Sequence, residues 1–322
     1  MAKYTSIGGQ ALIEGIMMKS PEKTALAVRK PDGDIDISYF EEKSLRDKYK
    51  ILKLPVIRGI VAYIESMIQG YKAMMISAEK SGFTDLEEDK EKKDEKKQSL
   101  IVSIVMAVGS VLGVALAVVL FMLIPRLIVG GIEVLFDTTL TKIARSGIEQ
   151  FIKLAVFVAY VWLITFMKDI KRVFMYHGAE HKTIFCYEKG LPLTVENVKM
   201  QKRFHPRCGT SFLILMILVS VIFSTLVQII FPSVYNTEWL WVVIKILLLP
   251  LICGVGFEVL RFCGKYDNII TKIISAPGMW LQRLTTKEPE DSMIEIAIAS
   301  LRACEPETPD VDRSIDTNGE AE

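Results

Sequence analysis

The sequence has almost no net charge and no leader at its start, and both absences narrow the class of protein. Its 39 lysines and arginines balance 38 acidic residues, which leaves a formal charge of +1. No overall basic field therefore favours nucleic acid as a partner. The first residues lack the charged stretch, apolar core and cleavage site of a secretory signal peptide. We expect no nucleic-acid partner and an N-terminus that stays in the cytoplasm.

Cysteine is also scarce. The five cysteines are an odd number and widely spaced, and two lie in or near apolar segments: Cys186, Cys208, Cys253, Cys263 and Cys304. This spacing does not predict a disulfide framework. A reducing compartment is therefore expected.

What the sequence has in abundance is apolar residues. They make up 51% of the chain, a fraction that favours lipid as a solvent. Roughly 20 helical residues suffice to cross the hydrocarbon core. Four runs satisfy this requirement, at 99–124, 148–167, 209–231 and 239–257. The short run 130–136 is predicted to pack at the outer interface. The fold class is thus mainly α, a polytopic helical membrane protein.

Lysine and arginine predict the orientation, because they are retained on the cytoplasmic side more strongly than acids. They are abundant before the first run, between the second and third, and after the fourth, whereas 232–238 has none. Arg126, Lys142 and Arg145 form a weaker set on the opposite side. We predict a multi-pass protein of the cell membrane with both termini cytoplasmic. The lipid bilayer is its first partner, and other membrane proteins are candidate partners.

The segments outside the predicted spans differ in composition. Residues 1–84 combine β-rich runs with helical spacing from Pro55 to Ile76, and predict a small cytoplasmic α/β module. Residues 85–98 carry acidic residues and lysines without an apolar face, which predicts a charged linker. The remaining predicted divisions are 99–167 for spans one and two, 168–208 for a cytoplasmic metal-binding loop, 209–260 for spans three and four, 261–304 for cytoplasmic helices, and 305–322 for a disordered tail.

All three histidines of the chain lie between 168 and 208. His177 and His181 are four residues apart, so on a helix they project from one face and can share one metal ion. Glu180 adjoins His181 and could orient or deprotonate a metal-bound water. This order, H-x-x-E-H, is typical of inverted zincins, in which a zinc hydroxide attacks a peptide carbonyl. Glu180 is therefore the candidate catalytic base.

A zinc site needs at least three protein ligands, and His205 and Cys208 are the nearest further candidates. If both bind, four ligands leave no position for a catalytic water, which favours a structural role. If only one binds, hydrolysis becomes possible. Three carboxylates are alternative ligands: Glu188, Glu196 and Glu258. Zinc is the default among divalent ions.

Two features precede the metal-binding loop. Glu14 is a carboxylate among apolar neighbours, and it either contacts the loop or lies at the surface, which is the simpler interpretation. The tripeptide Gly8-Gly9-Gln10 also occurs in release factors, but glycines in a turn explain it equally well.

Several motifs together carry a family resemblance. They are Gly8-Gly9-Gln10-Ala11-Leu12-Ile13-Glu14-Gly15-Ile16-Met17-Met18, Tyr176-His177-Gly178-Ala179-Glu180-His181-Lys182-Thr183-Ile184 and His205-Pro206-Arg207-Cys208-Gly209-Thr210-Ser211-Phe212. With 193–198 and 257–258, they resemble the YqhQ-like family of bacterial membrane proteins, from about Ile7 to Lys287. The resemblance implies a membrane protein that depends on a metal, and it names no reaction or substrate.

Two functional hypotheses follow. The leading one is a membrane-bound, metal-dependent hydrolase that acts on a peptide or lipid-linked substrate. Its metal ligands are His177, His181 and His205, with Cys208 as an optional fourth, and its general base is Glu180. The alternative is a non-enzymatic membrane assembly or scaffold protein in which the metal pins the loop to the bundle.

Overall fold

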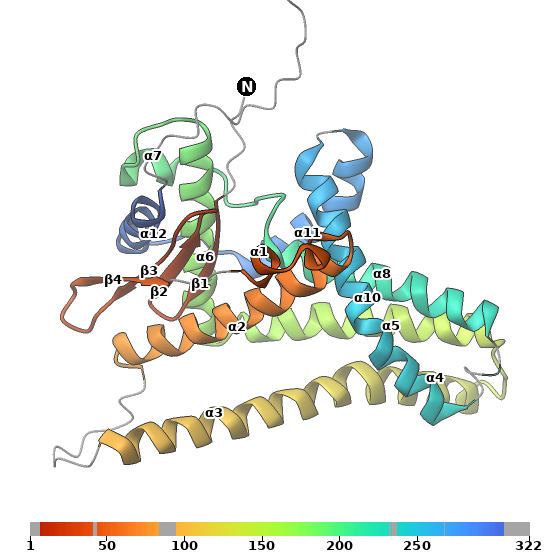
Figure 1. The fold of residues 1–322 in the computed structure, drawn as a ribbon. Helices are drawn as coiled ribbons and strands as arrows, with labels where there is room; N and C mark the ends of the chain where they lie inside the picture. The colour runs from red at the N-terminus through yellow and green to blue at the C-terminus, as the bar shows by residue number, and fades with distance from the viewer. Residues whose placement is uncertain are drawn as a thin grey trace, which may run out of the picture.

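The computed structural model describes residues 7–40, 44–83, 95–231, 233, 237–266 and 268–305, and it is mainly helical (Figure 1). A sheet of four antiparallel strands lies near its start, in the order β1 (Gly8–Leu12), β2 (Gly15–Lys19), β3 (Thr24–Arg29) and β4 (Ile35–Phe40). The helical elements that follow are α1 (Leu45–Lys48), η1 (Lys50–Lys53), α2 (Ile57–Lys80), α3 (Glu95–Val118), η2 (Val119–Leu123), α4 (Ile124–Leu135), α5 (Lys142–Ile164), α6 (Lys168–Glu188), α7 (Val195–Lys199), α8 (Gly209–Ile230), α10 (Glu238–Lys265), α11 (Ile269–Thr285) and α12 (Asp291–Cys304).

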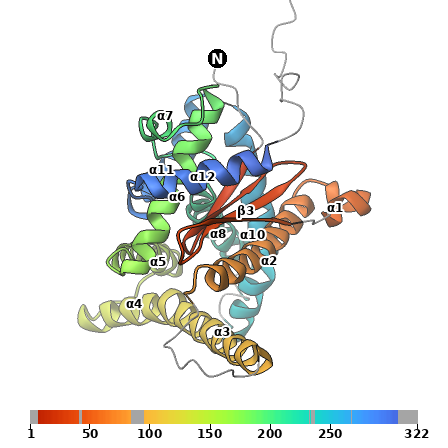
Figure 2. The ribbon, with the colours of Figure 1, turned by 90° about the vertical axis from the view of Figure 1, so that its left-hand side faces the viewer.

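The sheet is apolar on both faces, because successive residues of a strand point to opposite sides. On one face, Ile16 and Met18 pack with α6 and α12. On the other, Leu26 and Val28 pack against Ala73 of α2 (Figures 1 and 2). The sheet is therefore the middle of three layers, and α6, which carries the H-x-x-E-H motif, lies directly on it.

Helix α12 joins this module from the other end of the chain. The Ser300 hydroxyl donates a hydrogen bond to the Ala25 carbonyl at 3.1 Å, and Arg29 pairs with Glu295 at 2.9 Å. Residues 1–84 thus supply the sheet and α2, whereas α6 and α12 supply the second covering layer.

Four helices in the described part of the chain are long and apolar enough to cross a membrane, as the sequence predicts. They are Val108–Leu135, Ile143–Ile164, Gly209–Ile230 and Val243–Lys265. Their side chains are largely uncovered by protein, and Val111 and Leu127 are 69% and 72% exposed. Apolar surface of this extent is stable only against lipid or another protein.

The first of these helices differs from its predicted extent. The run was expected to end at residue 124, with 130–136 packed separately, but α3, η2 and α4 are continuous and 130–135 belongs to the same helix. Pro125 lacks the N–H that an α-helix needs and is crowded against the preceding turn. The widened π turn at 119–123 directly precedes the proline and accommodates it.

The linker and the tail fall mostly outside the described residues. Of the predicted linker at 85–98, only 95–98 is described, and it forms the first turn of α3. Of the predicted tail at 305–322, only Glu305 is described.

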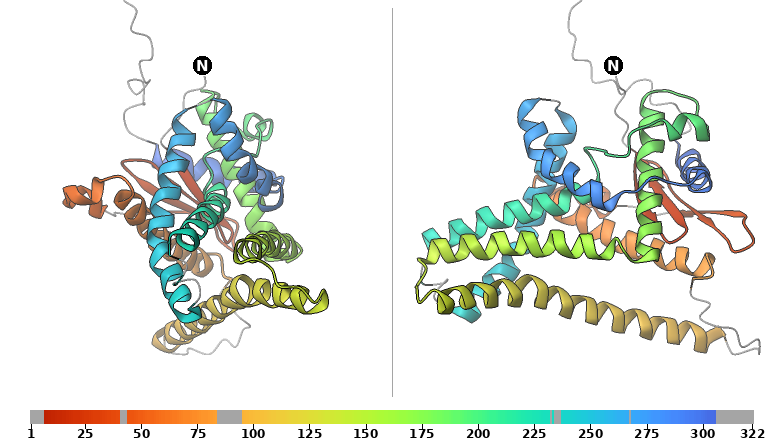
Figure 3. Two further views of the ribbon diagram at one scale, coloured as in Figure 1. Left: turned by 90° about the vertical axis from the view of Figure 1, so that its right-hand side faces the viewer. Right: turned by 180° about the vertical axis from the view of Figure 1, so that it is seen from behind.

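Helices α5 and α8 place the candidate site at one end of the apolar bundle. They lie side by side, with α6 standing at one end and α4 at the other (Figure 3). Helix α6 begins four residues after α5 ends, and α8 begins directly after Cys208. The H-x-x-E-H helix and Cys208 therefore meet at the same end.

Candidate metal centre

The H-x-x-E-H motif lies on helix α6, so the segment predicted as a loop is helical over 168–188. Every residue from Tyr176 to Ile184 is buried. The rings of His177 and His181 meet edge to face, with centroids 4.3 Å apart. The helical spacing therefore brings both imidazoles to one point, as the sequence predicts.

Each of these histidines is oriented by a backbone carbonyl. His177 Nδ1 lies 2.8 Å from the Thr285 oxygen, and His181 Nδ1 lies 2.5 Å from the Arg203 oxygen. A carbonyl can only accept a hydrogen bond, so each ring donates from Nδ1 and keeps the Nε2 lone pair for another partner. Metal-binding histidines are commonly held in this way.

Cys208 completes a group of three donor atoms. It is the N-cap residue of α8, and its Sγ lies 3.0 Å from His177 Nε2. One ligand atom each from His177, His181 and Cys208 lie within 4.8 Å of one another. Ligand atoms of a tetrahedral zinc site lie about 3.5 Å apart, given bonds of about 2.0–2.3 Å. The three donors therefore fit a single ion with small side-chain movements.

The protonation of His181 and of Cys208 suits a metal. Burial lowers the pKa of His181, which favours the neutral imidazole that a metal requires. Burial alone would raise the pKa of the Cys208 thiol, but His181 and Thr210 outweigh it and hold that pKa below its ordinary value. His181 Nε2 is buried and has no hydrogen-bond partner among the described residues. An unsatisfied buried nitrogen is costly, and a metal ion would satisfy it.

Glu180 belongs to α6, and its side chain is buried against strand β1. The Gly9 N–H donates a hydrogen bond to its carboxyl group, and burial raises the pKa of Glu180 to about 8, although His177 opposes the shift. A Cβ on Gly9 would lie 2.9 Å from both Cγ and Cδ of Glu180. The attribution of Gly8 and Gly9 to a turn is therefore wrong. They lie in β1, where the missing side chain of Gly9 makes room for Glu180.

His205 does not belong to the three-donor group, although its ring centroid is only 5.7 Å from that of His181. Its Nε2 points toward Glu188, 3.6 Å from Oε2, and its Nδ1 accepts a hydrogen bond from the Arg207 N–H at 3.3 Å. Burial lowers the pKa of His205 to about 4. The structure thus places His205 beside the predicted centre, facing a carboxylate.

The three alternative carboxylates also lie outside the group of donors. Glu188 is buried and pairs with Arg207, and Glu258 pairs with Arg58 at 2.5 Å. Glu196 is exposed on α7. The candidate ligands that converge are therefore two histidines and one cysteine.

Gly178 is a further residue of the site, and its place in the motif is the only sequence signal for it. A Cβ at this position would lie 2.0 Å from the Lys287 carbonyl oxygen. The segment after α11 passes directly over α6 here, which brings the Thr285 carbonyl to His177. The roles of Thr285 and Arg203 involve backbone atoms, so no residue type could have indicated them.

Glu14 is tied to α6, so its simpler interpretation as a surface residue is wrong. Its carboxylate accepts hydrogen bonds from Arg172 Nε at 2.5 Å and Nη2 at 2.7 Å, and from the Tyr176 hydroxyl at 3.0 Å. Its φ of 48° places it in the left-handed region, in the turn between β1 and β2. The turn between β1 and β2 thus binds the sheet to α6 through the Glu14 side chain.

Glu14→Gln is expected to lower the stability of the purified protein by about 1 kcal/mol, because a partly exposed ion pair contributes little more than this. Burial raises the pKa of Glu14, but Arg172 and Tyr176 outweigh it and hold the pKa below 4.5. The stabilisation is therefore present at neutral pH and lost as pH falls through the folded-state pKa. Thermal melting across pH measures it, with exposed Glu22→Gln as the control; equal melting of both variants at neutral pH contradicts the contact.

Comparisons with known proteins agree with the sequence resemblance. The profile of a family described as "Protein of unknown function (DUF1385)" matches residues 54–307. The uncharacterized protein YqhQ of Bacillus subtilis (strain 168) is 38% identical over 295 residues, which cover 91% of this chain and 90% of that relative. No solved structure matches the chain. The range matched by the family profile contains the three donor residues and the four apolar helices, and begins after the sheet.

Proposed function

This chain belongs to the DUF1385 family, and we propose that it is a membrane-bound, metal-dependent hydrolase. The observation that carries the proposal is the convergence of His177, His181 and Cys208 around one point, with the carboxyl group of Glu180 on the same helix. Three protein ligands leave one tetrahedral position for water or substrate, which is the arrangement of catalytic zinc sites.

The protein would supply orientation and proton transfer. A zinc ion, when bound, supplies a Lewis acid and a more acidic water. The Thr285 and Arg203 carbonyls hold the two imidazoles with Nε2 toward the ion. Glu180, next to His181 and held by the Gly9 N–H, would take a proton from the attacking water and return it to the leaving group. The role of Glu180 requires that the water reach its carboxyl group beside β1 and that this group be ionised, and the positive charge of a bound cation would oppose the effect of burial on its pKa.

The substrate class follows from the position of the centre. Cys208 directly precedes the apolar helix α8, and α6 follows α5 after a short connection. The reacting bond would therefore lie near the membrane surface, where a membrane-associated peptide or a lipid-linked substrate can reach it. The lysines and arginines on this side of the helices favour the cytoplasmic face, with both termini in the cytoplasm.

Glu180→Gln is expected to reduce hydrolysis by about 10²–10⁴-fold while metal content stays unchanged, because the amide cannot accept the proton. Turnover is measured on a fluorogenic peptide library and on a fluorescent peptide carried by a lipid chain, with zinc content measured on the same samples. Glu196→Gln is the matched control, since Glu196 is exposed on α7. Unchanged turnover and metal in Glu180→Gln would refute its catalytic role.

A structural metal site is the second candidate, and burial of the centre favours it. His177, His181 and Cys208 are 8%, 1% and 8% exposed. They connect α6 and the start of α8, while their carbonyl partners lie in the segments around 203 and 285. In this case chelation would lower the melting temperature sharply, no hydrolysis would be detected, and alanine at each ligand would destabilise the fold to a similar extent.

A further inference from the structure

The apolar bundle has a second polar region at the end opposite the candidate metal centre. The donor residues follow the C-terminal end of α5, whereas this region surrounds its N-terminal end. Helix α5 has 23 residues, which corresponds to ~34 Å at 1.5 Å per residue. The two ends of α5 are therefore separated by about the thickness of a bilayer core, and the polar region extends from the N-terminal end to Lys153 near the middle of the helix.

Six ionisable side chains from three helices make up this region. Arg145 pairs with Glu133 at 3.1 Å and with Glu149 at 3.4 Å. Lys245 of α10 lies within electrostatic reach of Lys153, Glu149 and Arg126. The members are the basic residues Arg126, Arg145, Lys153 and Lys245 and the acidic residues Glu133 and Glu149. The ion pairs of Arg145 therefore lie beside further basic side chains within the length of the apolar helices.

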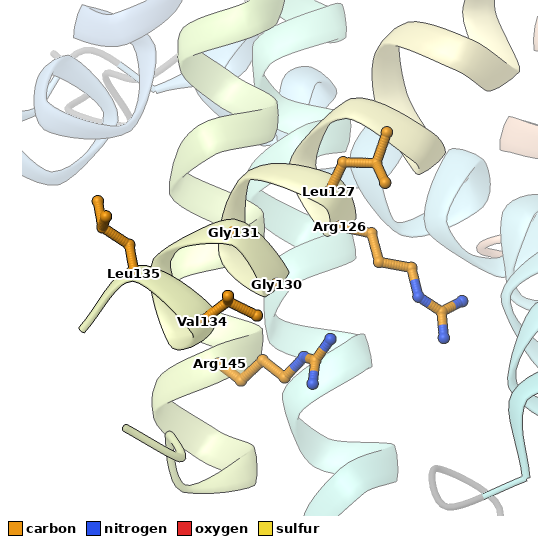
Figure 4. Close-up of a pocket in the computed structure, with 7 residues that line it drawn as sticks. All are labelled: Arg126, Leu127, Gly130, Gly131, Val134, Leu135 and Arg145. Carbon is orange, nitrogen blue, oxygen red and sulfur yellow. The ribbon is translucent and has the colours of Figure 1, made fainter. Parts of the chain in front are cut away.

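A cavity of about 770 Å³ opens beside this cluster, between α4 and the start of α5. Its lining combines two guanidinium groups with small and apolar residues: Arg126, Arg145, Gly130, Gly131, Leu127, Val134 and Leu135. Figure 4 shows both guanidinium groups on the same side of α4, with Leu135 pointing away from them. The apolar wall is open, since Val134 is 84% exposed.

The combination of two guanidinium groups with apolar side chains determines which class of ligand fits the cavity. A guanidinium group binds a phosphate oxygen pair through two parallel hydrogen bonds. A small hydrated anion would gain nothing from the exposed leucine and valine side chains. An amphiphile matches both the charged and the apolar part of the lining. Its headgroup contacts the arginines, and its chains continue along the lipid-facing surface of α4.

We propose that this cavity is a binding site for an anionic phospholipid of the leaflet opposite the metal centre. The phosphate lies between Arg126 and Arg145, Val134 lies beside the headgroup, and the acyl chains run along α4 past Leu127. A phosphate headgroup would bring a negative charge to guanidinium groups that lie within the depth of the apolar helices. The site is independent of the proposed hydrolase.

The glycines of α4 permit a test that leaves every charge in place. A Cβ on Gly130 would meet no heavy atom within 4 Å, so Gly130→Leu fills the cavity without a clash near the backbone. Arg126→Gln removes one positive charge. Arg261→Gln is the matched control, because Arg261 is exposed on α10 at the other end of the bundle.

The purified full-length protein in neutral detergent is titrated with phosphatidylglycerol, phosphatidylcholine or inorganic phosphate, and bound lipid is counted by native mass spectrometry beside thermal melting. Phosphatidylglycerol should bind at least about tenfold more tightly than phosphatidylcholine, and Arg126→Gln and Gly130→Leu should each weaken it by about tenfold. Arg261→Gln should bind as the unaltered protein does. Equal binding of both lipids, or unchanged binding in both cavity variants, overturns the site; equal stabilisation by inorganic phosphate overturns its assignment to a lipid.

Discussion

Cys208→Ser is expected to remove most of the bound zinc from the purified protein. The thiolate is one of three donors that converge, and two imidazoles alone leave the ion half solvated. Loss of a group that only orients a ligand lowers affinity by about 10–100-fold, so loss of a ligand should exceed the upper figure. Elemental analysis of the variant beside the unaltered protein, after identical dialysis, measures the difference.

Two control variants sharpen this result. Cys263→Ser removes a thiol of α10 outside the group and should leave zinc content unchanged. His205→Ala should also retain zinc, because His205 faces Glu188 and lies outside the three-donor set. Retention of zinc in Cys208→Ser, or its complete loss in His205→Ala, would show that Cys208 has been wrongly assigned as the third ligand in place of His205.

Gly178→Ala is expected to destabilise the protein by about 3 kcal/mol, the upper part of the range for overpacked sites. The added Cβ would lie 2.0 Å from the Lys287 carbonyl oxygen, which is backbone and cannot rotate away. The segment after α11 must then separate from α6 and withdraw the Thr285 carbonyl from His177. Zinc affinity should fall together with the melting temperature.

Gly147→Ala is the control for this substitution. Gly147 also lies within a helix, α5, but a Cβ there would meet no heavy atom within 4 Å. Alanine is the better helix former, so stability should stay constant or rise by up to about 1 kcal/mol. Melting of both variants under the same conditions measures the difference, and equal effects would contradict the close contact at Gly178.

Hydropathy predicts the four apolar helices well, because length and absence of charge are local properties of the sequence. Their ends are less accurate. The first charge-free run ends at Ile124, and the proline that follows normally ends a helix, yet the helix continues through a π turn to Leu135. A change of helical geometry of this kind is not visible in the hydropathy of the residues.

The candidate site likewise has one part that local sequence predicts and another part that it does not. The pairing of His177 and His181 follows from helical spacing, which is local. The choice between His205 and Cys208 depends on the conformation of the 203–208 segment. Gln282 of α11 fixes that segment by accepting from the His205 N–H and donating to the His205 carbonyl, both at 2.8 Å. These residues are 77 positions apart, so spacing alone could not exclude His205 from the donor group.

Strands β1 to β4 leave the ribosome before α12, which covers one face of them. The hydrogen bond from Ser300 to Ala25 spans 275 residues of chain. All four apolar helices must leave the ribosome in between. Until α12 emerges, the face of the sheet that carries Ile16 and Met18 is covered by α6 at most, and apolar surface left exposed in this way favours aggregation of the growing chain.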